Sequence, residues 1–98
     1  MHVGICRLDL RLPENMSLKD KRRVLRSVSA RVTGKFNVAI AEVDNGDRWQ
    51  LATLGICCIS NDHRHTNEVL SKVVDFIINS HPDAEILNYN IEIIPLSL

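Results

Sequence analysis

The densest group of functional side chains in this 98-residue sequence is a basic segment between residues 17 and 35. It holds seven Lys and Arg residues and one acid, a net charge of +6. At 100° per residue in a helix, four of the cations fall on one flank: Lys19, Arg22, Arg23 and Arg26. Such a row can follow nucleic-acid phosphates, contact an acidic protein, or form a solvated face balanced by acids elsewhere. We take these four as nucleic-acid-binding candidates, with Arg31 and Lys35 as an extension.

A second candidate site surrounds the dipeptide Asn45-Gly46, which is a strong signal for a two-residue hairpin turn. In that turn, Asp44 and Asp47 would lie opposite each other, and opposed like charges are unfavourable. Either the loop is longer, or Arg48 or a cation neutralises the pair. Trp49 is the only tryptophan, and it either caps the edge of the core or anchors a partner. The partner-binding candidates are therefore Asp44, Asp47, Arg48 and Trp49.

Other site chemistries find little support. His63 and His65 would face apart on a helix, and no Cys or His spacing matches a zinc site. The sequence has no glycine-rich phosphate loop, nucleophile elbow or pair of carboxylates in a catalytic arrangement. We expect no catalytic residues, metal, cofactor or small-molecule substrate, although an enzyme of an unfamiliar kind stays open.

Composition narrows the class of protein. Residues 1–98 are the length of a single domain, and 45% hydrophobic with 24% charged residues is typical of a water-soluble one. No run approaches the roughly 18 apolar residues of a membrane span, and no basic leader precedes an apolar run. Three cysteines, an odd number, fit a reducing compartment better than a disulfide framework. We therefore expect a cytoplasmic protein that does not enter a membrane.

The elements that position these sites follow from apolar periodicity. It predicts, in order, a strand at 6–12, a helix at 17–34, strands at 36–41 and 51–59, a helix at 62–80 and a strand at 85–94. Ser17 and Asp20 are placed to cap the first helix, and Gly34 to end it. In the last strand, one face is expected to carry Leu87, Tyr89, Ile91 and Ile93.

This βαββαβ order predicts an α+β ferredoxin-like plait, a four-stranded antiparallel sheet with two helices on one face. Strands one and three would be central, which leaves the other sheet face open or covered by a partner. Neither central strand offers an aromatic residue there, so RNA recognition by base stacking on the sheet is excluded. The strand at 51–59 is apolar on both faces, which favours an alternative function as a protein-interaction module or homodimer.

The run from Leu10 to Ser27 resembles the YlxP-like family, small bacterial proteins of unknown function. The similarity continues through residues 36–38, 41–44, 47–50 and 52–55, so it covers nearly the whole chain. It implies a ferredoxin-like fold and supplies no catalytic residues. Genes of this family often lie among those for transcription elongation, translation initiation and ribosome maturation factors, which suggests a role near the small ribosomal subunit.

The leading hypothesis from the sequence is therefore a non-catalytic protein that associates with RNA or the ribosome through its basic first helix. Its expected partner is ribosomal RNA or the small ribosomal subunit. The alternative is a protein-interaction module or homodimer that uses the open sheet face and has no nucleic-acid role.

Overall fold

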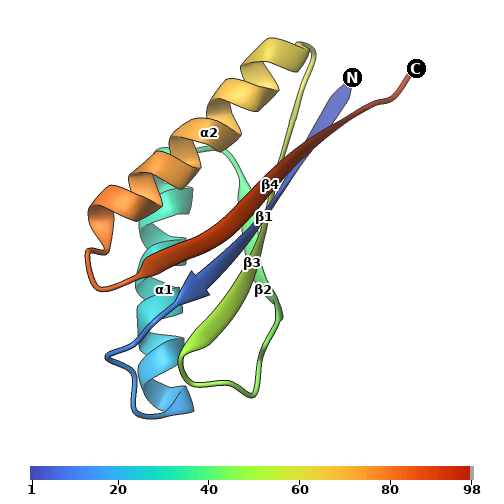
Figure 1. Ribbon diagram of the computed structural model, residues 1–98. Helices are drawn as coiled ribbons and strands as arrows, with labels where there is room; N and C mark the ends of the chain where they lie inside the picture. The colour runs from blue at the N-terminus through green and yellow to red at the C-terminus, as the bar shows by residue number, and fades with distance from the viewer. Residues whose placement is uncertain (98) are drawn as a thin grey trace.

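The computed structural model describes residues 1–97, which form a four-stranded antiparallel sheet and two helices (Figure 1). The elements are, in chain order, β1 (His2–Arg11), α1 (Leu18–Lys35), β2 (Ala39–Asp44), β3 (Leu51–Ser60), α2 (His63–Ser80) and β4 (Glu85–Pro95). The strand order is β2-β3-β1-β4, so the first and third strands are central, as predicted. This is the arrangement of a ferredoxin-like plait.

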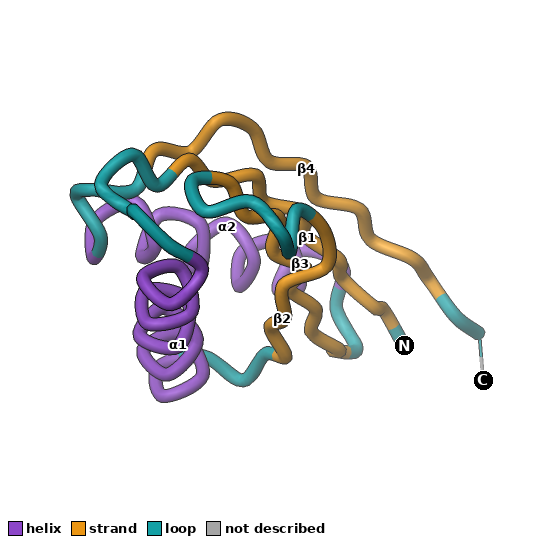
Figure 2. Tube along the Cα trace, turned by 90° about the horizontal axis from the view of Figure 1, so that it is seen from below, coloured by secondary structure: helices purple, strands orange, loops and turns teal. Residues whose placement is uncertain are grey.

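Both helices lie on one side of the sheet, and the core fills the space between (Figure 2). α1 packs near β2, whereas α2 lies across β1, β3 and β4. The buried side chains come from β1, β3 and both helices, and they include Leu8, Leu54, Val28, Val32, Leu70 and Ile77. None of the helices in residues 1–97 is long and apolar enough to span a bilayer.

The junction between α1 and β2 differs from the prediction. Gly34 lies inside the last turn of α1, and Phe36 is the C-cap with φ −123°, its N–H bonded to the Val32 carbonyl at 2.8 Å. The Phe36 ring meets Phe76 of α2 edge to face, with 5.7 Å between centroids. The predicted strand start at residue 36 and the glycine cap are therefore wrong, because this aromatic contact holds Phe36 at the end of the helix.

The register of β4 also departs from simple alternation. Asp9 pairs with Asn88 and Leu10 pairs with Ile86, so Leu87 has no partner and forms a β-bulge. Ile86 consequently packs against the core, and Leu87 is 54% exposed. The predicted shared face is confirmed for Tyr89, Ile91 and Ile93, which pair with residues on the helix side of β1, and it is wrong for Leu87.

Candidate interaction surfaces

Four cations of α1 form what we call the basic ridge: Lys19, Arg22, Arg23 and Arg26. All four side chains are exposed. The helix that carries them begins as predicted, because the Ser17 hydroxyl accepts a hydrogen bond from the Asp20 N–H at 3.1 Å and caps the first turn. The Asp20 carboxylate in turn accepts from the Met16 N–H at 2.8 Å, one residue before the N-cap, so only the Ser17 half of a capping box is formed.

The basic ridge has no acidic partner within residues 1–97. The ion pairs found there join Arg7 to Asp9, Arg11 to Glu85 and Lys21 to Glu42, and none includes a ridge residue. Arg22 and Arg26 also line a shallow hollow between α1 and β2 with Leu25, Ser29 and Glu42. The ridge therefore presents uncompensated positive charge on one flank of α1, as the spacing of its residues predicted.

Arg31 and Lys35 do not extend the ridge, although the sequence placed them with it. The Arg31 guanidinium donates to the Ser80 carbonyl of α2 at 3.3 Å. The Lys35 ammonium lies 4.9 Å from the ring centroid of Phe76, a cation–π contact. Both side chains therefore contact α2, away from the flank that carries Arg22 and Arg26.

The connection between β2 and β3 is a six-residue loop, residues 45–50, and not the predicted two-residue turn. Its first four residues form a turn in which the Arg48 N–H donates to the Asn45 carbonyl at 3.1 Å. Asn45 has φ 61°, a left-handed conformation that asparagine tolerates. The longer loop, one of the two alternatives left open by the sequence, is thereby confirmed. In this longer loop Asp44 and Asp47 do not lie opposite each other, because Asp44 pairs with Thr53 across the sheet.

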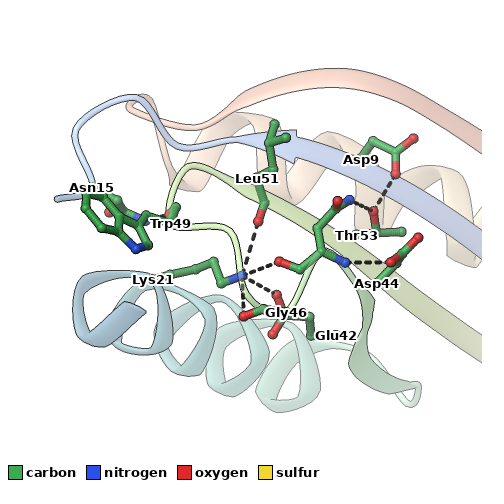
Figure 3. Close-up of polar contacts among 10 residues, drawn as sticks. Asp9, Asn15, Lys21, Glu42, Asp44, Gly46, Trp49, Leu51 and Thr53 are labelled. Carbon is green, nitrogen blue, oxygen red and sulfur yellow. Dashed lines mark hydrogen bonds and ion pairs between the residues drawn. The ribbon is translucent and has the colours of Figure 1, made fainter. Parts of the chain in front are cut away.

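A buried lysine holds this loop against α1 (Figure 3). The Lys21 side chain is 1% exposed, and its Nζ lies 2.8 Å from the Glu42 carboxylate. The same ammonium donates to the carbonyls of Asn45, Gly46 and Leu51 at 2.7, 3.2 and 3.2 Å. One cation therefore binds the start of the loop and the two strands that flank it to the helix.

A second set of hydrogen bonds joins the loop to the open face of the sheet. The Asn45 side-chain amide donates to the Thr53 hydroxyl at 2.9 Å, and that hydroxyl donates to Asp9 at 2.8 Å. The Asp44 carboxylate accepts from the Asn45 N–H at 2.7 Å. Asp44 thus fixes the start of the loop through one carboxylate oxygen and is exposed, so its part in binding a partner stays a prediction.

Trp49 lies at the far end of the same loop, beside the segment that leads into α1 (Figure 3). The buried Asn15 side chain donates to the Trp49 carbonyl at 3.2 Å, and the Gln50 amide donates to the Pro13 and Asn15 carbonyls. The Trp49 side chain is nevertheless 52% exposed. The loop therefore presents an indole on a backbone that is fixed at both ends, with Asp47 and Arg48 exposed next to it.

A hollow of about 270 Å³ lies between the α1 and α2 sides of the fold and has Glu14, Arg31, His81 and Asp83 in its wall. Burial and the nearby Arg31 lower the pKa of His81, an effect that Asp83 partly opposes. In this wall Arg31 donates to the Ser80 backbone carbonyl. Within residues 1–97, no group of three or more His, Cys, Asp or Glu could hold a metal ion.

The predicted site residues do not include four that build the loop site, namely Lys21, Glu42, Asn15 and Thr53. One signal was available, because Lys21 falls within the apolar stripe of its helix. That position predicts a lysine whose stem packs and whose ammonium snorkels to solvent. The prediction of a solvated ammonium is wrong, because the whole side chain is buried and its charge is paired with Glu42. Recognising its partners required the knowledge that the loop lies over α1.

The comparisons with known proteins agree with the family that the sequence resembles. Residues 3–91 match the family described as "Protein of unknown function (DUF503)". The chain is also 36% identical over 83 residues to "Uncharacterized protein YlxP" of Bacillus subtilis (strain 168), which covers 85% of this chain and 89% of that protein. The chain therefore belongs to the DUF503 family of proteins of unknown function, which includes YlxP-like proteins.

Proposed function

We propose that this chain is a non-catalytic cytoplasmic protein that binds RNA through the basic ridge and acts on the small ribosomal subunit, in its maturation or in translation. The observation that carries the proposal is the row of four exposed cations without an acidic partner in residues 1–97. Like charges on neighbouring helical turns repel each other, so an anionic partner that runs along α1 would relieve this repulsion. Neutralising phosphates also releases their counterions, which favours binding.

The distribution of charge favours a surface on the helix over one on the sheet. On the open face, β1 carries Arg7, Asp9 and Arg11, and the first two form an ion pair at 3.5 Å. The neighbouring β3 offers no aromatic residue there. A plait that binds single-stranded RNA on its sheet uses aromatic side chains from these two strands. Phosphate contacts from α1 are therefore the mode that this chain supports.

The three free cysteines are consistent with the proposed compartment. Cys6 and Cys58 are buried on the helix side of the sheet, and Cys57 is exposed on the other side. None is paired. Unpaired thiols, one of them accessible, suit a reducing environment.

A second candidate function is a protein-interaction module that uses the open sheet face. The observation that favours it is that three apolar side chains on this face, Ile5, Val43 and Ile59, are 40%, 62% and 67% exposed. Several exposed apolar side chains on one face are found at interaction sites. If this face binds a protein, Ile59→Glu should abolish the interaction, and the basic ridge should be dispensable for it.

The proposal is tested by co-sedimentation with small ribosomal subunits across a salt series. The test variant carries Lys19→Glu, Arg22→Glu and Arg26→Glu. A matched control carries Arg48→Glu, Arg64→Glu and Lys72→Glu, which changes the net charge equally but on exposed positions off the ridge. We expect salt-sensitive binding by the wild type and the control, and loss of binding in the test variant. Equal loss in both variants, or no binding at low salt, would overturn the proposal.

A further inference from the structure

The β4 edge of the sheet is uncovered. β4 is an outer strand in the order β2-β3-β1-β4, it runs for 11 residues, and Figure 2 shows it at the outside of the sheet. Apart from the pairing with β1, no hydrogen bond within residues 1–97 reaches the β4 backbone. An edge strand of this kind presents a row of free N–H and C=O groups to another strand.

The hydrogen bonds between Met1 and Leu96, just beyond the end of β4, indicate which β4 backbone groups point away from β1. The Met1 nitrogen donates to the Leu96 carbonyl at 3.1 Å, and the Leu96 N–H donates to the Met1 carbonyl at 2.8 Å. Leu96 therefore directs both backbone groups toward β1. Because this direction alternates along an antiparallel strand, the backbone groups that point away from β1 are those of Tyr89, Ile91 and Ile93.

Two features limit the free segment. Pro95 occupies the next outward position and has no N–H to donate. The bulge at Leu87 interrupts the strand at the other end. The segment available for pairing is therefore 88–94, and its central residue is Ile91.

We propose that a second copy of this chain pairs antiparallel with residues 88–94, with the two-fold axis at Ile91, so that two sheets join into one. In this register Tyr89 of each copy lies opposite Ile93 of the other, and Asn90 lies opposite Glu92. Tyr89 is 51% exposed and Ile93 is half-buried, so the pairing covers apolar surface on the helix side. On the other side, each carboxylate meets an amide and not another acid.

The charge and shape of the two edge strands, β2 and β4, favour pairing of β4 with the β4 of a second copy over pairing with its β2. β2 has only six residues, and a bulge at Val43 interrupts its register. Its Glu42 and Asp44 would approach the acids of β4, which has no Lys or Arg. Pairing between β2 and β4 would also continue from copy to copy, whereas pairing between two β4 strands closes as a dimer. No ridge residue takes part, so this inference is independent of the proposed function.

The test uses sedimentation velocity from low to high micromolar protein with two matched variants. Asn90→Glu places a carboxylate opposite Glu92 at two symmetric positions, and we expect it to raise the dimer dissociation constant about tenfold or more. Asn88→Glu adds the same charge opposite Ile94, and its effect should be clearly smaller. A third variant, Tyr89→Pro, removes an outward N–H without removing a bond to β1, and it should be monomeric with an intact circular dichroism spectrum.

Amide hydrogen exchange identifies the pairing directly. The N–H groups of Tyr89, Ile91 and Ile93 should gain protection as the protein concentration rises, whereas those of Asn90 and Glu92 are already bonded to β1 and should change little. A monomer at every concentration would overturn the proposal. A dimer in which these three amides gain no protection, or one that Asn88→Glu and Asn90→Glu weaken equally, would also overturn it.

Discussion

The ammonium of Lys21 and the carboxylate of Glu42 lie 2.8 Å apart, in a place where the lysine side chain is 1% exposed and the glutamate side chain is 28% exposed. Glu42 is on the helix side of β2, opposite Leu54 of β3, so its carboxylate points toward α1. Burying a lysine is costly unless its charge is paired and its N–H groups are bonded. Here the carboxylate and three carbonyls meet both conditions.

Lys21→Met should destabilise the protein by about 3 kcal/mol, because it leaves a carboxylate and three carbonyl groups without their donor. Urea denaturation measures the loss. Lys19→Met is the control, since Lys19 is exposed on the same helix, and it should change the free energy of unfolding by less than about 0.5 kcal/mol. Similar values for the two variants would contradict the role of Lys21 in holding the 45–50 loop.

Alanine substitutions at two glycines test the space around them: Gly4 lies against α2, and Gly34 lies in the last turn of α1. A Cβ at Gly4 would meet Thr66 and would lie 2.7 Å from the Leu70 Cδ1, so Gly4→Ala should cost about 1–3 kcal/mol by overpacking. Nothing lies within 4 Å of a Cβ at Gly34, which is helical, so Gly34→Ala should stabilise by about 0.5–1 kcal/mol. Thermal unfolding of both variants checks these opposite signs. An unchanged melting temperature for Gly4→Ala would contradict the packing.

Much of the fold could be predicted because its main elements have unambiguous periods. Alternation in β1 and the apolar stripe of α2 identified their buried faces, and α1 begins at the expected cap. The errors occur where a tertiary contact decides the local structure. Phe36 ends α1 because it packs on Phe76, and the Leu87 bulge brings Ile86 into the core. Neither contact can be read from a local pattern.

For the candidate site too, local spacing predicts some residue positions, whereas others depend on contacts distant in the sequence. Spacing at 100° per residue was sufficient to place Arg22 and Arg26 on one exposed flank of α1. The separation of Arg31 from them follows from its bond to Ser80, a residue distant in the sequence. The role of Lys21 likewise depends on carbonyls that lie 24 to 30 positions further along the chain.

Stability should fall at alkaline pH because of the buried thiol of Cys6. Burial raises the pKa of this thiol from 9.0 to about 11. Its contribution to stability is fully present below pH 9 and is lost progressively toward pH 11, because the unfolded chain releases the proton while the folded one retains it. The loss from this group is on the order of 2 kcal/mol.

Urea unfolding of the wild type and of Cys6→Ala, from neutral pH to about pH 11, measures this loss. The variant begins less stable because it leaves a cavity, but its curve should fall less steeply above pH 9. Parallel curves over that range would contradict the assignment to Cys6.

Binding of an unstructured RNA should weaken with salt in proportion to the number of ridge cations in contact with phosphates. Four contacts at about −0.7 each predict a slope near −3 for log K against log salt concentration. Arg26→Ala should reduce the size of that slope by about 0.7, because it removes one phosphate contact. Arg31→Ala should leave the slope unchanged, since its guanidinium is bound to the Ser80 carbonyl of α2. Fluorescence anisotropy of a labelled single strand at several salt concentrations gives all three slopes. A slope near zero, or equal reductions in the two variants, would exclude the basic ridge as the phosphate-binding surface.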